Sequence, residues 1–521
     1  MKVQIHQRHR HLKRTLVIII PCLLWLFIGV QPLLAVKATE AASDERQTAA
    51  SAVPTTDNGT ITISVQGAIM MALGHNRSLK VEQLTPAIKE TLEDQEEAVF
   101  SPVLEGDITL TQEQGNSQSS PERDIESGNV NADVGLSRYY PTGTDVEVSL
   151  SSKMSWSNHY SDFHASRLGV SITQALLRGK GTDFNLARIR KADLGTQISR
   201  YEVRGFSESL IASVEKTYWD YALARHRIDI YRESLHIAEK QKEEIEEMIR
   251  FGKISESELV VAMAEIAMRR EGLITAQSTL EKTKLQLIRL LSPPVMNPWN
   301  QKIVLTDRPV LPDVQMDTVA SHVALALSRR ADIGEAQLKI DGGDIELVRT
   351  KNGLLPRMDL FITLGKTGYA GSFGNSIRDI DENSYDLYGG ISFEYPLANR
   401  AARALHRNAV LTKRQLEEAL ENLKELAEVD VRSAYIEVEN ARKQIEATEA
   451  THALQQEKLR IETEKFRFGK STTLQVAQSQ RDLLESRIAK TRAIVTYLKS
   501  FVDLYRLEGS LLERRGITLV E

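Results

Sequence analysis

The chain has 521 residues, with 66 Lys and Arg against 71 Asp and Glu and a formal net charge of −5. This acidic balance argues against a nucleic-acid-binding protein, because such proteins usually present a basic surface. Cys22 is the single cysteine, so an internal disulfide and a zinc site built from several cysteines are both excluded.

The first 38 residues have the composition of a secretory signal peptide. Residues 1–14 are basic, residues 16–30 form an apolar run, and the small residues Ala35 and Ala38 follow. The run is shorter than the roughly 20 residues that span a membrane, although a retained anchor is the alternative. We expect residues 1–38 to be removed on export and residues 39–60 to form a flexible linker. Losing the six basic residues of positions 1–38 leaves 60 basic against 71 acidic residues, a net charge of −11.

The first half of the mature chain is expected to contain helices, then strands, then a long helical hairpin. Helical periodicity covers residues 61–104, and alternating segments typical of strands cover 105–177. The helical hairpin covers 178–291 and begins with Asp183–Arg250, which lacks proline and repeats apolar residues every three, four or seven positions. This pattern predicts a helix of about 65 residues and about 100 Å, too long to fold into a globule.

One part of the strand segment is expected to be an added β-hairpin. Residues 131–156 contain two alternating runs around the turn at 140–144, and the second half of the chain has no counterpart. Two arrangements stay open. The hairpin joins the sheet and gives six strands per subunit, or it stands outside a four-stranded sheet as a loop.

The second half repeats the order of the first. Residues 292–316 form a linker, followed by helices at 317–355, strands at 356–397, a long helical hairpin at 398–507 and a tail at 508–521. Residues 213–253 align with 430–470 without a gap, and both segments end in Arg-Phe-Gly-Lys. Chance does not keep one offset over such a length, so we interpret the chain as an internal duplication.

Each Arg-Phe-Gly-Lys copy lies between two helical segments. Gly252 and Gly469 are placed to take the left-handed backbone with which helices often end. Phe251 and Phe468 are then in position to pack on the last helical turn. Both tetrapeptides are therefore predicted to form the corner of a helical hairpin.

Too few strands are present to close a sheet within one subunit. Unpaired strand edges are not tolerated in a bilayer, so closure by several subunits is the expected solution, with a soluble β-sandwich as the alternative. Aromatic residues near the predicted strand ends fit the girdles of a membrane barrel. They are Tyr139, Tyr140, Trp156, Tyr160, Phe163, Tyr369, Phe373, Tyr385 and Tyr388.

The signal, the duplication, two strand blocks and two helix corners together resemble the TolC-like outer-membrane factors, over residues 61–509. The strand-to-helix joints at Ser171–Gly181 and Ser392–Arg400 are also similar, although Ala175 stands where the family usually has proline. The resemblance implies an α+β membrane protein. Its trimeric β-barrel would lie in the outer membrane of a Gram-negative bacterium and continue as a long α-helical barrel through the periplasm.

The resemblance further implies an exit duct of a tripartite efflux pump for drugs, metabolites or other small solutes. Its partners would be two further copies of the chain, outer-membrane lipid, a periplasmic adaptor protein and an inner-membrane pump or ABC transporter. The adaptor would dock at the two corners, formed by Arg250, Phe251, Gly252, Lys253, Arg467, Phe468, Gly469 and Lys470.

The resemblance also places a pore constriction and a set of tip contacts. The constriction falls at Gln475 and Gln478, amides where the family carries carboxylates, so weak cation selectivity is expected. Polar contacts between the two hairpins fall at Ser257, Glu258, Phe466 and Ser471, although a phenylalanine cannot form the hydrogen bond.

Two other functions stay open, and enzymatic activity is not expected. The same duct could serve type I protein secretion, and a periplasmic coiled-coil adaptor or scaffold is the alternative of another class. His159 with His164, and Asp341 with Asp344, have no third ligand at a metal-binding spacing. Arg178–Gly181 lacks the rest of a phosphate-binding loop. We expect no catalytic residue, metal or cofactor.

Overall fold

The structure is a computed structural model that describes residues 55–57, 60–116, 124–157, 161–311, 316–381 and 384–518. The expected signal peptide with Cys22, most of the linker at 39–60, and Tyr160 lie outside the described residues. For these positions the sequence analysis stays a prediction.

Six strands form a single antiparallel sheet in the order β3–β4–β5–β6–β8–β9. The predicted extra hairpin is β4 and β5, which pair along their length and are joined by a turn with Gly143 at a φ of 86°. Because the hairpin lies inside the sheet, the alternative of a separate loop is wrong. The strands are β3 (Val103–Asn116), β4 (Asp124–Tyr140), β5 (Thr144–Ser157), β6 (Phe163–Ala175), β8 (Arg357–Ala370) and β9 (Tyr385–Glu394).

Alternation along the strands gives the sheet one apolar and one polar face. Directly paired residues of neighbouring strands point to the same side, so the register identifies the two faces. One row of exposed apolar side chains crosses all six strands, and the next row, which points to the other face, contains Ser137, Glu147, Ser171 and Thr363. The apolar row is Leu104, Leu136, Val148, Val170, Leu364 and Leu387.

The same register divides the predicted aromatic girdle between the faces. Tyr140, Trp156 and Tyr385 belong to the apolar face. Four others belong to the polar face, where the rings of Phe163 and Tyr369 stack with centroids 5.7 Å apart. The girdle prediction is wrong for these four, because a shift of one residue along a strand moves a side chain to the opposite face. These four are Tyr139, Phe163, Tyr369 and Tyr388.

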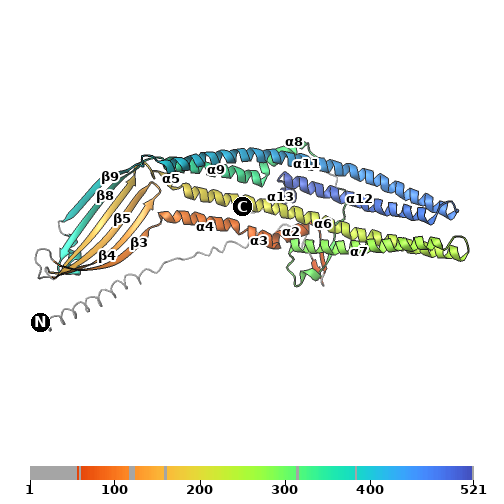
Figure 1. The fold of residues 1–521 in the computed structure, drawn as a ribbon, viewed down its shortest axis with the longest axis horizontal. Helices are drawn as coiled ribbons and strands as arrows, with labels where there is room; N and C mark the ends of the chain where they lie inside the picture. Colours follow the sequence, from red (N-terminus) through yellow and green to blue (C-terminus); the bar gives the residue numbers. More distant parts are fainter. Residues whose placement is uncertain are drawn as a thin grey trace, which may run out of the picture. The chain divides into compact units, whose positions relative to one another are not determined.

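Two pairs of long helices run away from the sheet, as Figure 1 shows. The first pair, here called hairpin one, is α6 (Ala187–Arg250) with α7 (Ser257–Leu291). The second, hairpin two, is α11 (Arg400–Arg467) with α12 (Thr473–Leu507). Their longest helices have 64 and 68 residues, and both corners lie at the end remote from the strands.

Most of the shorter elements surround the middle of the hairpins, where β1, β2 and β7 form a small separate sheet, whereas α10 and η3 lie against β6 and β8. None of the described helices combines the length and the apolar character that crossing a membrane requires. The shorter elements are β1 (Thr55–Asp57), β2 (Thr60–Ile63), α2 (Val65–His75), α3 (Arg77–Glu82), α4 (Thr85–Glu97), η1 (Ala98–Phe100), α5 (Thr182–Asn185), η2 (Pro298–Asn300), β7 (Lys302–Leu305), α8 (Val319–Arg329), α9 (Ala331–Asn352), α10 (Phe373–Arg378), η3 (Asp379–Asp381) and α13 (Leu511–Arg514).

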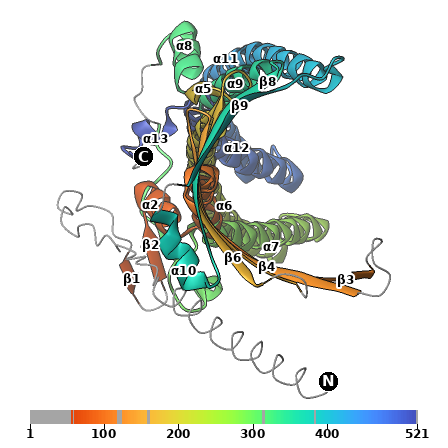
Figure 2. The same cartoon turned by 90° about the vertical axis from the view of Figure 1, so that its left-hand side faces the viewer.

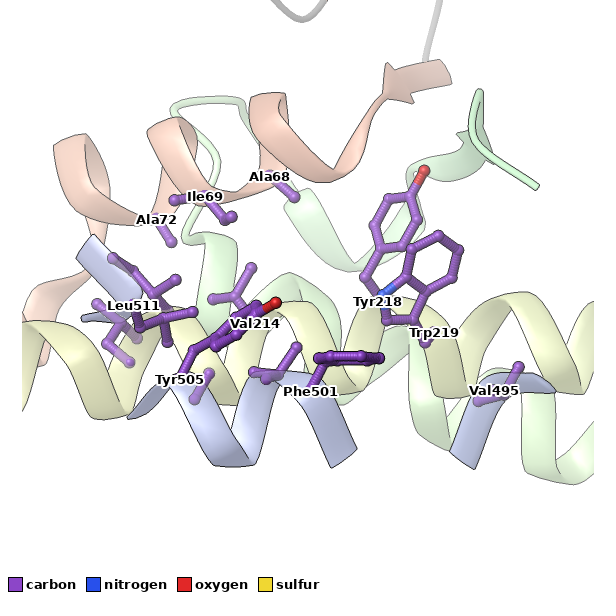
Figure 3. Close-up of a cluster of buried hydrophobic side chains, with 14 of the residues drawn as sticks. Ala68, Ile69, Ala72, Val214, Tyr218, Trp219, Val495, Phe501, Tyr505 and Leu511 are labelled. Carbon is purple, nitrogen blue, oxygen red and sulfur yellow. The ribbon is translucent and has the colours of Figure 1, made fainter. Parts of the chain in front are cut away.

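A hydrophobic cluster joins the two hairpins at this level (Figure 3). Tyr218 of α6 is fully buried and donates a hydrogen bond from its hydroxyl to the carbonyl oxygen of Ile63, 3.2 Å away. Phe501 and Tyr505 of α12 pack from the other hairpin, and Leu511 of α13 closes the cluster. Burying an aromatic or aliphatic side chain of this kind stabilises the fold by about 2–3 kcal/mol. The cluster therefore fixes the position of the two hairpins relative to each other at this level.

Candidate functional site

The corner of hairpin one is closed by a Schellman turn. The N–H of Lys253 donates to the carbonyl of Met248 at 2.9 Å, and the N–H of Gly252 donates to that of Ile249 at 2.9 Å. Gly252 has a φ of 68°, as predicted from the sequence. These two bonds are the ones that satisfy the last carbonyls of a helix in this motif.

The corner of hairpin two repeats the same geometry. The N–H of Lys470 donates to the carbonyl of Lys465 at 2.8 Å, the N–H of Gly469 to that of Phe466 at 2.9 Å, and Gly469 has a φ of 72°. No atom lies within 4 Å of a Cβ added at Gly252 or Gly469. Both glycines are therefore required by backbone conformation and not by a close neighbour.

The phenylalanines at the corners do not pack on the last helical turn as expected. Phe251 is 72% exposed and Phe468 is 74% exposed. The four cations predicted at the corners, Arg250, Lys253, Arg467 and Lys470, are exposed as well. Each corner therefore presents one aromatic ring beside basic side chains.

The two corners differ where the second helix begins. In hairpin two, Thr472 accepts a hydrogen bond from the N–H of Gln475 at 3.3 Å, and the Gln475 side chain accepts one from the N–H of Thr472 at 3.2 Å. This reciprocal pair is a capping box. In hairpin one, Ser255 and Glu258 have the same spacing, but α7 starts without a side-chain cap at its N-cap residue. The sequence pattern S/T-x-x-E/Q signals such a box, and the sequence analysis missed it.

The four residues predicted to tie the corners together do not meet across the hairpins. The Ser257 hydroxyl donates to that of Ser255 at 3.0 Å, within hairpin one. The Ser471 hydroxyl bonds with Glu462 and Gln475 at 2.9 Å each, within hairpin two. Within the ranges that the structure describes, neither serine bonds to the other hairpin, so no tie between the corners forms in the single chain.

The hairpins are joined instead by a buried polar network further from the corners. Glu265 of α7, 5% exposed, forms ion pairs with Arg269 of the same helix and with Arg481 of α12. Arg269, 2% exposed, also donates to Gln480 of α12 at 3.4 Å, and Gln480 donates to Gln241 of α6 at 2.6 Å. Sequence reasoning could not find this network, because its partners lie far apart in the chain.

Gln475 and Gln478 are both exposed on α12, but neither amide is isolated. Gln475 belongs to the capping box described above. Gln478 donates to Asp482 at 2.9 Å and accepts from Arg481 at 2.5 Å. The cation of Arg481 and the carboxylate of Asp482 therefore flank Gln478, and the weak cation selectivity stays a prediction.

Several carboxyl groups of the hairpins have displaced pKa values, and Asp482 and Glu208 are displaced in opposite directions. A hydrogen bond from Lys458, with an Nζ to Oδ2 distance of 2.7 Å, holds the pKa of Asp482 below its usual range. Burial raises the pKa of Glu208 to about 7, and the partly opposing Arg204 lies 3.7 Å away. Asp482 therefore stays ionised at neutral pH, whereas Glu208 is half-protonated there.

No group of three or more potential metal ligands occurs among the residues with described positions. The model of the outer membrane efflux protein family matches residues 323–510, which cover α8, α9, β8, β9 and hairpin two. Over this part the chain is similar to the outer membrane efflux proteins.

Two outer membrane proteins are similar to the chain over a longer stretch. The chain is 22% identical over 320 residues to the pyoverdine export outer membrane protein OpmQ of Pseudomonas putida, over 60% of this chain and 64% of that protein. It is 24% identical over 332 residues to OpmQ of Pseudomonas aeruginosa, over 62% and 66% of the two chains. Both matches thus span slightly less than two thirds of these relatives.

The fold agrees with that of a solved family channel. The structure of the outer-membrane channel OprN matches with a TM-score of 0.66 and 16% identity, over 90% of this chain and 99% of that one. This likeness covers strands and long helices together. The mixed architecture of the chain is therefore that of this outer-membrane channel.

Proposed function

We propose that the chain is one subunit of an outer-membrane exit duct for a tripartite efflux pump. The observation that carries the proposal is the exposed apolar row that crosses all six strands, with a polar row behind it. A sheet that is apolar on one exposed face and polar on the other is suited to lipid outside and water inside. A periplasmic adaptor is surrounded by water, so an exposed apolar sheet face does not fit that function.

The edges of the sheet require further copies of the chain. β3 and β9 are the two edge strands, and each leaves one side unpaired within the subunit. Lipid does not tolerate unpaired backbone groups, so each edge must pair with a neighbouring copy. Because six strands alternate in direction, β9 of one copy meets β3 of the next in antiparallel orientation. Three copies, as in the family, give a closed barrel of about 18 strands.

The corners are proposed to dock the periplasmic adaptor, which couples the duct to an inner-membrane pump or ABC transporter. The exposed Phe251 and Phe468 rings support this role, because large exposed apolar side chains at a surface often mark a protein contact. Three copies present six corners with nearly the same backbone turn, which suits an adaptor ring of six members.

The cargo is proposed to be a small solute. The two relatives named above export pyoverdine, a small molecule, which favours efflux over the type I protein secretion that the same duct geometry permits. Deleting the gene should then raise sensitivity to small toxic compounds or retain a metabolite in the cell. Loss of one secreted protein, with unchanged solute export, would instead support the secretion alternative.

The first experiment tests insertion and assembly. Leu136→Arg places a charge on the apolar face at a cost of about 2–4 kcal/mol in lipid, whereas Ser137→Arg, one residue along, places it on the polar face beside Glu147. We expect the first variant to fail to insert and the second to form conducting trimers in a planar bilayer. Equal insertion of both variants, or a wild-type monomer in mild detergent, would overturn the proposal.

The constriction is proposed to lie at Gln475 and Gln478, now with Arg481 and Asp482 beside it. The expected mature chain has no cysteine, so Gln475→Cys introduces a single thiol that three copies would bring near the channel axis. A short bifunctional thiol reagent should cross-link the subunits and block conductance. A reactive thiol that does not cross-link in the resting channel would remove Gln475 from the constriction.

A further inference from the structure

The connection between β8 and β9 folds back over the sheet. It contains α10 and η3, which contact β6 and β8. Ser376 of α10 and Ser166 of β6 are both fully buried, and their hydroxyl oxygens lie 2.7 Å apart. Asp379 accepts a hydrogen bond from the N–H of Tyr369 at 2.7 Å, so the connection is held in the second half of α10 and directly after it.

Gly368 establishes on which face α10 lies. It pairs with Ser166 and belongs to the same alternating set as Leu364, so a side chain at this position would point to the apolar face. A Cβ added there would overlap the carbonyl oxygen of Ser376 and lie 2.6 Å from the backbone nitrogen of Ile380. α10 therefore covers the apolar face, and Figure 2 shows it on the convex side of the curved sheet.

The helical turn exposes apolar side chains on this face. Phe373 is 50% exposed and Ile377 is 40% exposed. They are four positions apart, so they share one side of the turn. Tyr385, at the same end of the sheet, belongs to the apolar face and is 74% exposed. The apolar surface thus continues from the strands onto α10.

Two cations border this surface. Lys366 follows Leu364 in the alternating set of β8, and Arg378 is the last residue of α10. Both are exposed, and neither has a carboxylate within ion-pair distance among the described side chains. The neighbouring Asp379 carboxylate is engaged by the N–H of Tyr369.

We propose that α10 with Lys366 and Arg378 binds the phosphate-bearing headgroup of a glycolipid of the outer leaflet, with Phe373 and Ile377 beside it at the membrane interface. Guanidinium and ammonium groups form charge-assisted hydrogen bonds with phosphate, and aromatic residues favour the membrane interface. The surface lies at the sheet end remote from the periplasmic helices, which faces the outer leaflet. The inference rests on the proposed function, because only a sheet that spans the outer membrane brings this surface to lipid.

The test uses the full assembly, purified in mild detergent and titrated with bisphosphorylated lipid A or with dephosphorylated lipid A. Native mass spectrometry counts the bound lipid. The wild type should prefer the phosphorylated lipid. Since a cation near an anionic lipid surface contributes a factor of about five, Lys366→Gln should weaken binding about fivefold and the double variant with Arg378→Gln about 25-fold.

Lys153→Gln is the matched control. Lys153 is exposed at the same end of the sheet, but it pairs with Ala165 on the polar face, so its loss should leave lipid binding unchanged. Equal binding of dephosphorylated lipid, or equal loss in the Lys153 and Lys366 variants, would overturn the inference while channel conductance stays intact. A chain that neither inserts nor conducts would overturn the proposed function, and this inference with it.

Discussion

Hairpin one and hairpin two end in the same backbone turn, but their equivalent carboxylates have different partners. These are Glu265 and Asp482, which are 217 positions apart (482 minus 265). In hairpin two, Asp482 pairs with Lys458 of the same hairpin at 2.7 Å and stays partly exposed. In hairpin one, Glu265 is buried and pairs with Arg481 of the other hairpin. This carboxylate thus pairs within hairpin two in one case and across to hairpin two from hairpin one in the other, and Gln241 stands where hairpin two has Lys458.

Replacing Glu265 by Gln should break this comparison most strongly. It removes the carboxylate from Arg269, which is 2% exposed and would stay buried without its charge partner. Breaking a buried ion pair in this way costs about 3–5 kcal/mol, to be measured as the free energy of unfolding in urea. The control is Asp482→Asn, whose partly exposed pair should be worth less than about 1 kcal/mol. Similar losses for both variants would mean that the two carboxylates are equivalent.

The second prediction concerns the pH dependence of stability. Burial raises the pKa of Glu208 from 4.5 to about 7, so the folded protein holds this proton more tightly than the unfolded chain. Stability contributed by this group is therefore present below pH 4.5 and lost as the pH rises through about 7. Glu208→Gln should leave stability at pH 4 unchanged and raise it at pH 8 by about 2–3 kcal/mol.

Glu425 supplies the matched position in hairpin two, 217 residues later (425 minus 208), and it is exposed. Glu425→Gln removes a carboxyl from an exposed position and is the control for the substitution itself. Thermal unfolding of the two variants and the wild type, measured over the pH range of the preceding paragraph, shows whether Glu208 causes the pH dependence. A wild-type slope that survives in Glu208→Gln would assign the titration to another group.

Substitutions of the two corner glycines should have the same effect in both hairpins. Gly252→Val and Gly469→Val each force a β-branched residue into a left-handed backbone, at a cost of about 1–2 kcal/mol. Both variants should still reach the membrane, because the extensive helix packing outweighs this loss, but efflux in a drug-sensitivity assay should fall. Normal efflux by both variants would show that the corners do not dock the adaptor.

The smallest predicted effect separates the two corners again. Thr472→Ala removes the capping box of α12 and should cost about 1 kcal/mol. Ser255→Ala, at the corresponding position in hairpin one, should cost only about a few tenths of 1 kcal/mol, because α7 does not begin with a capping box. Hydrogen exchange of the first turn of each helix measures the local opening. Equal increases in exchange would show that the two corners are capped alike.

Local signals in the sequence predicted more than contacts between distant residues. Gly252 and Gly469 could be predicted as helix ends, because a glycine between two helical segments commonly takes the left-handed conformation that ends the first helix. Tyr139 and Tyr140 could not be assigned to faces without the strand register, and alternation alone did not show whether 131–156 entered the sheet. The pair Glu265 and Arg481 depends on how two hairpins pack, which neither periodicity nor spacing encodes.

In the proposed trimer, the added hairpin would change the width of the exit. Four strands from each of three copies would make a barrel of about 12 strands, whereas six make about 18, and barrel diameter grows roughly in proportion to strand number. The opening would be about 1.5 times wider and its cross-section roughly doubled. The helices contributed by each copy are not increased in the same ratio. In such an assembly the helical tube, not the sheet, sets the largest cargo that passes.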